Sequence, residues 1–271
     1  MASHPHPGFR RIGLIAKPED PRLVSTLERV DGFLAAQGVQ VVPGPNAAAA
    51  LGRAREGVAL ADMGSHCDLA LVIGGDGTLL TAARELAPSA LPLAGINLGR
   101  LGFLVDISPE GMIEALRAIL QGDYREDRRF LLEARIGDAP PVLALNDVVL
   151  HKWNLARMVE FETWIDGVFV DVQRSDGVIL STPTGSTAYA LSGGGPLLMP
   201  NLDAMAIVPI CPHTLSNRPL VIPGDSQIEL RVCGRTDPAD VRVTCDGQHL
   251  LSLSAGHHLS VHRHPQPVRV I

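Results

Sequence analysis

A short apolar run in the first third of the chain breaks into a turn whose residue types suit phosphate chemistry. Residues 70–81 read A-L-V-I-G-G-D-G-T-L-L-T. Consecutive N–H groups in a glycine-rich turn, followed by a helix N-terminus, form a cradle for anions. Asp76 lies in the middle of this turn, where its charge opposes phosphate binding, and it is therefore a candidate catalytic residue. The alternative is structural: the glycines supply positive φ, and Asp76 or Thr78 caps the next helix.

The turn does not match either of two common phosphate-binding signatures. The chain has no G-x-x-x-x-G-K-[ST] sequence, and no G-x-G-x-x-G follows this strand. Any phosphate must therefore be bound by a different arrangement.

A second stretch, residues 177–202, reads G-V-I-L-S-T-P-T-G-S-T-A-Y-A-L-S-G-G-G-P-L-L-M-P-N-L and contains no charged residue. Its hydroxyl groups could bind ribose and phosphate oxygens, and its glycines would let a ligand come close to the backbone. Tyr189 could stack on a flat ring. The alternative is a loop in which Ser and Thr side chains cap local turns. The stretch alone leaves both interpretations open.

Composition restricts the class of protein. The chain has 271 residues, 46% of them hydrophobic and 19% charged, with a formal net charge of −6 at pH 7. An acidic balance of this kind argues against a general binder of nucleic acid or of anionic membranes. The four cysteines form no C-x-x-C pair, no apolar run reaches transmembrane length, and the N-terminus lacks the apolar core of a signal peptide. We therefore expect a cytoplasmic protein that binds phosphates on small molecules.

Strand and helix patterns alternate in the first part of the chain. We expect strands at residues 12–16, 39–42, 69–73 and 93–97, and helices at residues 21–37, 79–86 and 109–121. Such alternation predicts parallel β-α-β units, in which ligands bind at the carboxyl ends of the strands. The glycine-rich turn lies at such an end.

The pattern then changes to short alternating strands. Residues 159–165 and 168–172 flank Asp166 and Gly167, which is a strong hairpin signal, and further strands are expected at residues 228–232, 241–244 and 259–262. We predict an α/β domain with a parallel sheet over residues 1–105 and a β-rich, sandwich-like domain over residues 106–258. Residues 259–271 are expected to form a C-terminal strand that returns to the first domain.

Four motifs, in this order, resemble the NAD kinase family of the bacterial type. They are G-G-D-G-T at 74–78, G-I-N-L-G-R-L-G-F-L at 95–104, L-N-D at 145–147, and S-D-G followed by S-T-P-T-G-S-T-A-Y across 175–189. The first motif alone is weak, because phosphofructokinases and diacylglycerol or sphingosine kinases share that type of loop. The last motif and the Asn-acid pair are far more specific. The resemblance extends from about residue 12 to residue 261.

The resemblance implies transfer of the γ-phosphoryl group of ATP to the 2′-hydroxyl of the adenosine ribose of NAD, which gives NADP. It assigns Asp76 as the base that takes the hydroxyl proton, a role in which positioning dominates. Mg²⁺ or Mn²⁺ is expected to arrive with ATP, because the sequence shows no dense cluster of carboxylates, His or Cys that would hold a metal by itself. The β-sandwich-like second domain and a final strand that returns to the first domain are also features of the family.

The resemblance further assigns the nucleotide contacts. Asn146 and Asp147 match the pair that holds the ribose hydroxyls, and a carboxylate beside an amide suits a diol because together they accept and donate hydrogen bonds. The family usually has Glu at the second of these positions. Asp176 and the residues from Thr187 to Ser192 match positions that hold the adenine, the nicotinamide riboside and the ribose. The complete expected set is Gly74, Gly75, Gly77, Thr78, Phe103, Asn146, Asp147, Arg157, Arg174, Asp176, Thr184, Thr187, Ala188, Tyr189, Ala190, Leu191, Ser192, His213 and Gln248.

Several of these residues have structural alternatives. The Asn146–Asp147 pair could be a strand-edge turn, and Phe103 could belong to a core. Arg157 and Arg174 could be solvated surface residues, while His213, which lies in P-H-T-L-S-N-R-P, could be a structural histidine or lie at a subunit interface.

The expected partners are small-molecule nucleotides and further copies of the chain, as a homodimer or homotetramer, with no nucleic acid and no membrane. Two other functions compete with NAD kinase activity. One is a different G-G-D-G-T kinase that acts on a lipid or a sugar, and the other is a non-catalytic NAD(P)-binding sensor.

Overall fold

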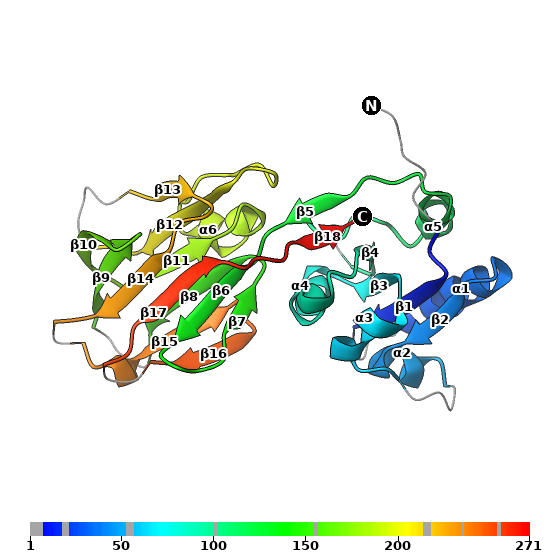
Figure 1. Cartoon of the computed structure of the whole chain (residues 1–271), viewed down its shortest axis with the longest axis horizontal. Coiled ribbons are helices and arrows are strands. Elements are labelled where there is room, and N and C mark those ends of the chain that lie inside the picture. The colour runs from blue at the N-terminus through cyan, green and yellow to red at the C-terminus, as the bar shows by residue number, and fades with distance from the viewer. Residues whose placement is uncertain are drawn as a thin grey trace. The chain divides into compact units, whose positions relative to one another are not determined.

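The chain forms two compact units (Figure 1). The computed structural model describes residues 8–17, 22–52, 57–99, 102–153, 157–213, 218–234, 236–253 and 256–271. Met1–Arg128 and Gln266–Ile271 make up the first unit, and Arg129–Pro265 make up the second. Within the described residues, no helix has the length and the apolar character that a membrane crossing requires.

The boundary between the units lies after residue 128, whereas the sequence pattern placed it after residue 105. The difference comes from helix α5 (Met112–Leu120), whose apolar stripe of Met112, Leu116 and Ile119 is buried in the core of the first unit. At the other end of the chain, β17 (Leu259–Arg263) pairs with strands of the second unit, and only β18 (Val268–Val270) belongs to the first.

The first unit is built around a six-stranded sheet with the strand order β2-β1-β3-β4-β18-β5. Its further elements are β1 (Arg11–Ala16), α1 (Leu23–Ala36), β2 (Gln40–Pro43), α2 (Pro45–Ala50), α3 (Met63–His66), β3 (Leu69–Gly74), α4 (Asp76–Leu86), β4 (Leu93–Asn97) and β5 (Asp127–Arg129). The pairs β1–β2, β1–β3, β3–β4 and β4–β18 are parallel. Parallel strands place their carboxyl ends at one edge of the sheet, and β3 ends there in the glycine-rich turn.

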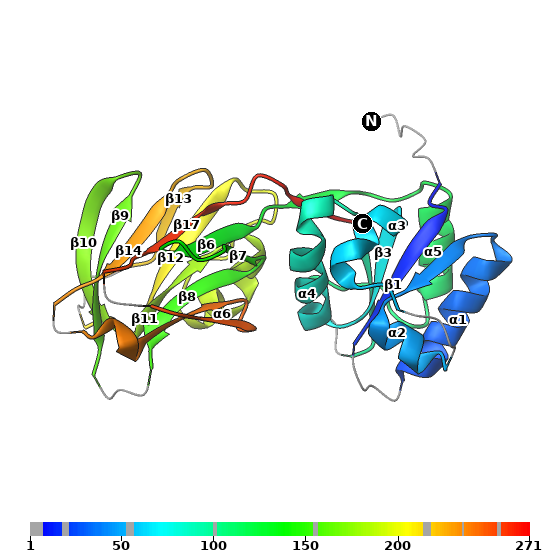
Figure 2. The ribbon, with the colours of Figure 1, turned by 60° about the horizontal axis from the view of Figure 1, so that its bottom comes forward.

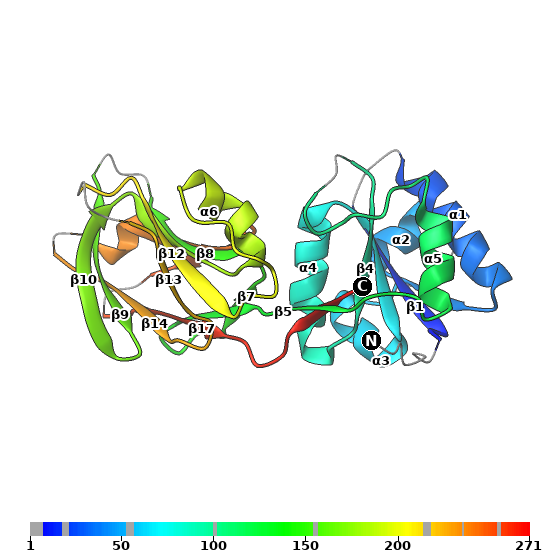
Figure 3. The ribbon, with the colours of Figure 1, turned by 90° about the horizontal axis from the view of Figure 1, so that it is seen from above.

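Helices cover both faces of this sheet. Helices α1 and α5 lie on one side of β1 and β3, and α4 lies on the other (Figures 2 and 3). Leu27, Val30 and Leu34 of α1 pack with strand residues such as Leu14 and Leu71, all of them fully buried. Both faces of strand β3 are therefore buried, which explains its continuous apolar sequence.

The second unit contains two antiparallel six-stranded sheets. The first has the order β10-β9-β14-β17-β6-β7 and the second the order β13-β12-β11-β8-β15-β16. Their bounds are β6 (Leu132–Ile136), β7 (Val142–Ala144), β8 (Asp147–Lys152), β9 (Val159–Ile165), β10 (Val168–Ser175), β11 (Gly177–Ser181), β12 (Ala204–Ile210), β13 (Leu220–Pro223), β14 (Ile228–Val232), β15 (Val241–Cys245) and β16 (His249–Ser252), with helix α6 at Tyr189–Ser192.

The two sheets share one core. Phe161 and Val261 from the first sheet pack with Leu150, Leu180 and other buried residues of the second. Strand β9 alternates buried and partly exposed residues, whereas β11 is buried throughout, because Ala190 of α6 packs with Ile179 and Val208 in a second apolar cluster on that sheet. The predicted fold class, a parallel α/β unit followed by a β-rich unit, is confirmed.

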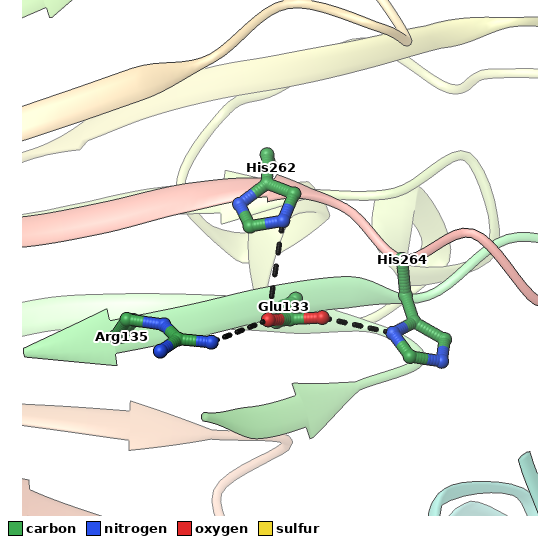
Figure 4. Close-up of polar contacts among 4 residues, drawn as sticks. All are labelled: Glu133, Arg135, His262 and His264. Carbon is green, nitrogen blue, oxygen red and sulfur yellow. Dashed lines mark hydrogen bonds and ion pairs between the residues drawn. The ribbon is translucent and has the colours of Figure 1, made fainter. Parts of the chain in front are cut away.

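A polar network joins β6 to β17 close to the point where the chain leaves the second unit (Figure 4). His264 Nδ1 lies 2.9 Å from Glu133 Oε2, and Arg135 donates to Glu133 Oε1 over 3.3 Å. His262 Nε2 lies 3.9 Å from the same Oε1. Burial alone would raise the pKa of Glu133, but these three partners outweigh it and hold the pKa below its usual range. The network therefore stabilises the strand pair while Glu133 is ionised.

Candidate functional site

The glycine-rich turn is shorter than the sequence pattern predicted. Strand β3 ends at Gly74 and helix α4 begins at Asp76, so Gly75 alone separates them. The predicted helix start at residue 79 was wrong because Asp76, Gly77 and Thr78 adopt the first helical turn, despite the low helix propensity of glycine. The N-terminus of helix α4 thus lies directly at the carboxyl end of β3.

Asp76 does not cap its helix. The N-cap residue is Gly75, and no side chain makes a capping hydrogen bond there. The Asp76 carboxylate instead accepts three backbone N–H bonds from a segment nearly thirty residues further along the chain: from Phe103 at 3.0 Å, Leu104 at 3.3 Å and Val105 at 3.2 Å. The carboxylate is therefore oriented by fixed backbone donors.

Gly102 permits this close approach. A Cβ atom at residue 102 would overlap the Asp76 carboxylate, so the segment can pass so near only with glycine. The next residue, Phe103, is 73% exposed, which excludes the core role and leaves its ring open to a ligand. Residues 100 and 101 of the same motif lie outside the described residues.

The second unit contains a pocket of about 540 Å³ on the face of its second sheet that carries α6. Five residues singled out from the sequence line it together: Asn146, Asp147, Asp176, Ala188 and Tyr189. They come from the start of β8, from the connection between β10 and β11, and from the N-terminus of α6. The pocket residues Asn146 and Gly247, which are 101 positions apart in the chain, are thus close in space because β8 and β15 are neighbours in one sheet.

Hydroxyl groups hold the carbonyl side of the Leu145–Asp147 turn. The Thr182 hydroxyl donates to the Leu145 carbonyl over 2.6 Å, the Thr182 N–H donates to the Asn146 carbonyl over 2.9 Å, and the Ser181 hydroxyl lies 3.4 Å from the latter oxygen. Gly185 packs so tightly that a Cβ atom would overlap the Asn146 backbone. Part of the S-T-P-T-G-S-T motif therefore serves to position the Asn-acid pair.

Asp246 holds the N–H side of the same turn. Its carboxylate accepts N–H bonds from Asn146 at 2.7 Å, Leu145 at 3.0 Å and Asp147 at 3.2 Å, and its own N–H donates to the Asp147 carbonyl over 2.9 Å. The turn is thereby fixed from both sides.

Asp147 is the most electrostatically perturbed carboxyl of the pocket. Its side chain is 5% exposed, and burial, reinforced by the negative charge of Asp246, raises its pKa to about 7. Desolvation and a neighbouring like charge both disfavour the ionised form. Near neutral pH, Asp147 therefore exists partly as a neutral carboxylic acid, which can donate as well as accept a hydrogen bond.

Asp176 has a different environment. Lys152 Nζ donates to Asp176 Oδ1 over 2.6 Å, and both side chains are about 30% exposed at the pocket wall. Gly177 follows with φ of 155°, and a Cβ atom there would overlap the Leu150 carbonyl, so glycine is needed at this position beside Asp176. The pocket thus contains three carboxyl groups and one lysine.

The other predicted residues of the T-P-T-G-S-T-A-Y-A-L-S stretch do not line this pocket. Thr184 is buried and accepts from Arg129 over 3.3 Å, and the Thr187 hydroxyl donates to the Thr184 carbonyl. Ala190 is buried in the apolar cluster under α6, whereas Leu191 and Ser192 are exposed. The interpretation in which hydroxyls cap local turns thus applies to Thr187, and to Ser186, which bonds the Pro183 carbonyl over 2.7 Å.

Four further predicted residues lie in the second unit away from the pocket lining. Arg157 is exposed, and Arg174 of β10 is exposed and forms an ion pair with Glu160 at 3.8 Å. His213 donates its N–H to the Arg174 carbonyl, and residues 214–217 of its motif lie outside the described residues. Gln248 is exposed next to the pocket-lining Gly247.

Sequence reasoning missed several pocket residues: His151, Lys152, Thr244, Asp246 and Gly247. One signal was available. Asp246 and Gly247 separate two strands by two residues, and Asp-Gly in that context is a strong hairpin signal. Among the described residues, no group of three His, Cys, Asp or Glu side chains gathers in an arrangement that could hold a metal ion.

Comparison with known proteins covers both units. The model of the ATP-NAD kinase N-terminal domain matches residues 12–124, and that of the ATP-NAD kinase C-terminal domain matches residues 145–271. The chain is similar to crystal structures of yeast NADH kinase complexed with NADH (TM-score 0.86, 26% identity, 97% of this chain and 83% of that chain) and of an Archaeoglobus fulgidus NAD kinase in complex with ATP (TM-score 0.77, 26% identity, 96% and 92%).

Closer relatives are bacterial. The chain is 48% identical to an NAD kinase of Nitrosococcus oceani, over 97% of this chain and 91% of the relative, and 48% identical to one of Halorhodospira halophila, over 100% and 91%. Because both domain models match and the similarity extends over nearly the whole length, the chain belongs to the NAD kinase family.

Proposed function

We propose that the chain transfers the γ-phosphoryl group of ATP to the 2′-hydroxyl of the adenosine ribose of NAD and so produces NADP. The observation that carries this proposal is the pocket of the second unit, where Asn146, Asp147, Asp176 and Tyr189 of the separate sequence motifs line one cavity. Family membership makes the chain a phosphotransferase, and the chemistry of the pocket supports NAD as the acceptor.

The pocket suits the uncharged and cationic parts of NAD rather than its phosphates. Asp176, Asp246 and the ionised fraction of Asp147 together outweigh the charge of Lys152, which disfavours a phosphate and favours ribose hydroxyls or the positively charged nicotinamide ring. The amide of Asn146 and the carboxyl of Asp147 offer both donors and acceptors to a diol. Tyr189, which is 47% exposed, offers its ring to a base.

Asp76 is the proposed proton acceptor. A carboxylate has about four acceptor sites, and three backbone N–H bonds occupy three of them. One site remains for a substrate hydroxyl, whose proton moves to Asp76 as the phosphoryl group is transferred. The donor is ATP carrying Mg²⁺ or Mn²⁺, since such ions usually reach kinase sites with the nucleotide phosphates. The positive end of the α4 helix dipole favours those phosphates near the glycine-rich turn.

We further propose that the protein works in the cytoplasm as a homodimer or homotetramer. The remaining predicted contacts, at Arg157, Arg174, His213 and Gln248, are part of this proposal, because family motifs assign them to the nucleotide.

The test is a direct assay. Purified protein is incubated with NAD, ATP and Mg²⁺, and NADP is measured with a dehydrogenase that accepts NADP and not NAD. We expect NADP to accumulate with time and with enzyme concentration, and we expect none without ATP. Tight NAD binding without NADP formation, under conditions in which a control NAD kinase is active, would instead identify a non-catalytic NAD-binding protein.

A further inference from the structure

The Asp246 turn has the geometry of a two-residue hairpin. Asp246 has φ of 52° and Gly247 has φ of 63°, and the Gln248 N–H donates to the Cys245 carbonyl over 3.0 Å. Two successive residues with positive φ form a turn that matches the twist of the flanking strands β15 and β16. The Asp246 side chain therefore extends from a tight turn, and its carboxylate accepts hydrogen bonds from the amides of residues 145–147 at the start of the neighbouring strand β8.

A second hairpin in the same unit provides a natural comparison. Asp166 and Gly167 connect β9 to β10 with φ of 51° and 76°, and the Asp166 carboxylate accepts the Gln227 N–H over 2.8 Å. Both hairpins therefore use the same residue pair, the same backbone conformation and a carboxylate bonded to backbone amides. Only Asp246 lines the pocket and bonds the backbone of Asn146 and Asp147.

We propose that Asp246 is a positioning residue for NAD binding, which fixes the Asn146–Asp147 pair toward the ribose through its hydrogen bonds to the three amides of the Leu145–Asp147 turn. This inference rests on the proposed function, because it takes the pair to be the ribose-binding pair. Hydrogen bonds to a charged acceptor are roughly twice as strong as neutral ones, and these three converge on a single carboxylate.

The charge of Asp246 has a second effect on the same pair. Together with burial, it favours the protonated form of Asp147, whose pKa of about 7 lies in the physiological range. The other titratable groups around Asp147 are His151 and Lys152 on its own strand, Asp176 on the β10–β11 connection, Tyr189 on α6 and Cys245 on β15. The test must therefore separate Asp147 from the imidazole of His151, which lines the same pocket.

The test compares Asp246→Asn with the matched hairpin variant Asp166→Asn in the full-length protein. Asparagine tolerates positive φ, but its NH₂ group cannot accept the Leu145 N–H that one oxygen of Asp246 now accepts. We expect Asp246→Asn to raise the KM and the calorimetric Kd for NAD about tenfold, with the KM for ATP unchanged. Asp166→Asn should leave all three values at those of the wild type.

The pH profile of NAD binding provides a second measurement. It should not change if Asp246 has only a structural role. In the wild type we expect a midpoint near pH 7, the pKa of Asp147, and in Asp246→Asn a midpoint at lower pH, because a like charge has been removed. Asp147→Asn should abolish the midpoint. A midpoint that persists in Asp147→Asn would assign it to another group, such as His151, and would overturn this part of the proposal.

The outcomes are separable from those of the proposed function. A wild type that makes no NADP contradicts the function, whereas a fully active wild type with unchanged NAD affinity in folded Asp246→Asn contradicts the positioning role alone. If Asp246→Asn does not fold, Asp246→Glu retains the charge on a longer arm. We then expect Asp246→Glu to weaken NAD binding and to keep the midpoint of the pH profile. A folded Asp246→Glu variant that binds NAD like the wild type, but with a shifted midpoint, would overturn the proposal.

Discussion

Asp76 in the first unit and Asp246 in the second use their side chains in the same way. Each is half-buried, and each accepts three backbone N–H bonds from consecutive residues far away in the sequence, at 103–105 and 145–147 respectively. A carboxylate that accepts several amides is therefore not in itself a sign of chemistry. It shows that a backbone segment is held in place.

The two carboxylates differ in the segments that they hold in place. The amides bonded to Asp76 belong to an irregular connection whose Phe103 is exposed, and Asp76 itself starts helix α4 beside the glycine-rich turn. The amides bonded to Asp246 lead into strand β8 and carry the buried, partly protonated Asp147. In our proposals, Asp76 accepts a proton from the substrate, whereas Asp246 orients other groups.

The variant Asp76→Asn tests most directly whether Asp76 takes part in the reaction or only holds residues 103–105. We expect kcat to fall by about 10²–10⁴-fold because the proton acceptor is lost, with an unchanged or lower KM for ATP because a negative charge leaves the phosphate turn. Steady-state kinetics with a thermal melt measures both. If Asp76 only anchors residues 103–105, the melt should shift while turnover per folded molecule stays near that of the wild type.

A second prediction concerns the effect of the raised pKa of Asp147 on the stability of the protein. Asp147 has a pKa of about 7 when folded and about 4 when unfolded, so the folded state binds more protons between these values. The contribution of Asp147 to the stability of the ligand-free protein should therefore fall as the pH rises from about 4 to 7, by up to about 4 kcal/mol in total. This cost is absent when the residue cannot ionise.

Asp147→Asn tests this directly. The neutral amide should make the free protein more stable than the wild type at pH 8, by up to about 4 kcal/mol, and no more stable near pH 4. Urea unfolding at the two pH values measures the difference. A gain that is equal at both values would mean that packing, and not ionisation, accounts for it.

A third prediction tests the role of Asp147 in binding. Asp147→Ala should weaken NAD binding by about 1–3 kcal/mol, the usual cost of unpaired buried polar partners, and should raise the KM for NAD more than that for ATP. Asp147→Glu should be tolerated, since the additional methylene can extend into the pocket. Equal effects of the Ala variant on both substrates would place Asp147 away from the ribose.

The smallest expected effect belongs to Glu133, a carboxylate held by side chains rather than by backbone amides. Its pKa is lowered in the folded protein, so its contribution is present above about pH 4.5 and is lost as the pH falls through the folded value. Glu133→Gln should therefore cost about 1 kcal/mol at pH 7 and little at pH 3, by thermal melts. A change in kcat or in the KM for NAD would contradict a purely structural role.

Local patterns predicted about half of the strands that the structure describes, namely β1 to β4, β9, β10, β14, β15 and β17. Val159–Ile165 alternates because one face of β9 is buried, and Leu69–Gly74 is continuously apolar because both faces of β3 are covered. The unit boundary could not be predicted in the same way. An apolar helical stripe such as that of α5 indicates that the helix is buried but does not indicate against which core.

The sequence by itself determined the family and the change from a parallel α/β unit to a β-rich unit, because these depend on short-range spacing and on motifs that are contiguous in the chain. Tertiary structure alone decided that Asp76 bonds residues 103–105, that Asp246 bonds residues 145–147, and that Asp147 shares its pocket with Asp176 and Asp246. The physical reason is that hydrogen bonds, burial and pKa values depend on neighbours in space, and those neighbours lie 27 to 101 residues apart in this chain.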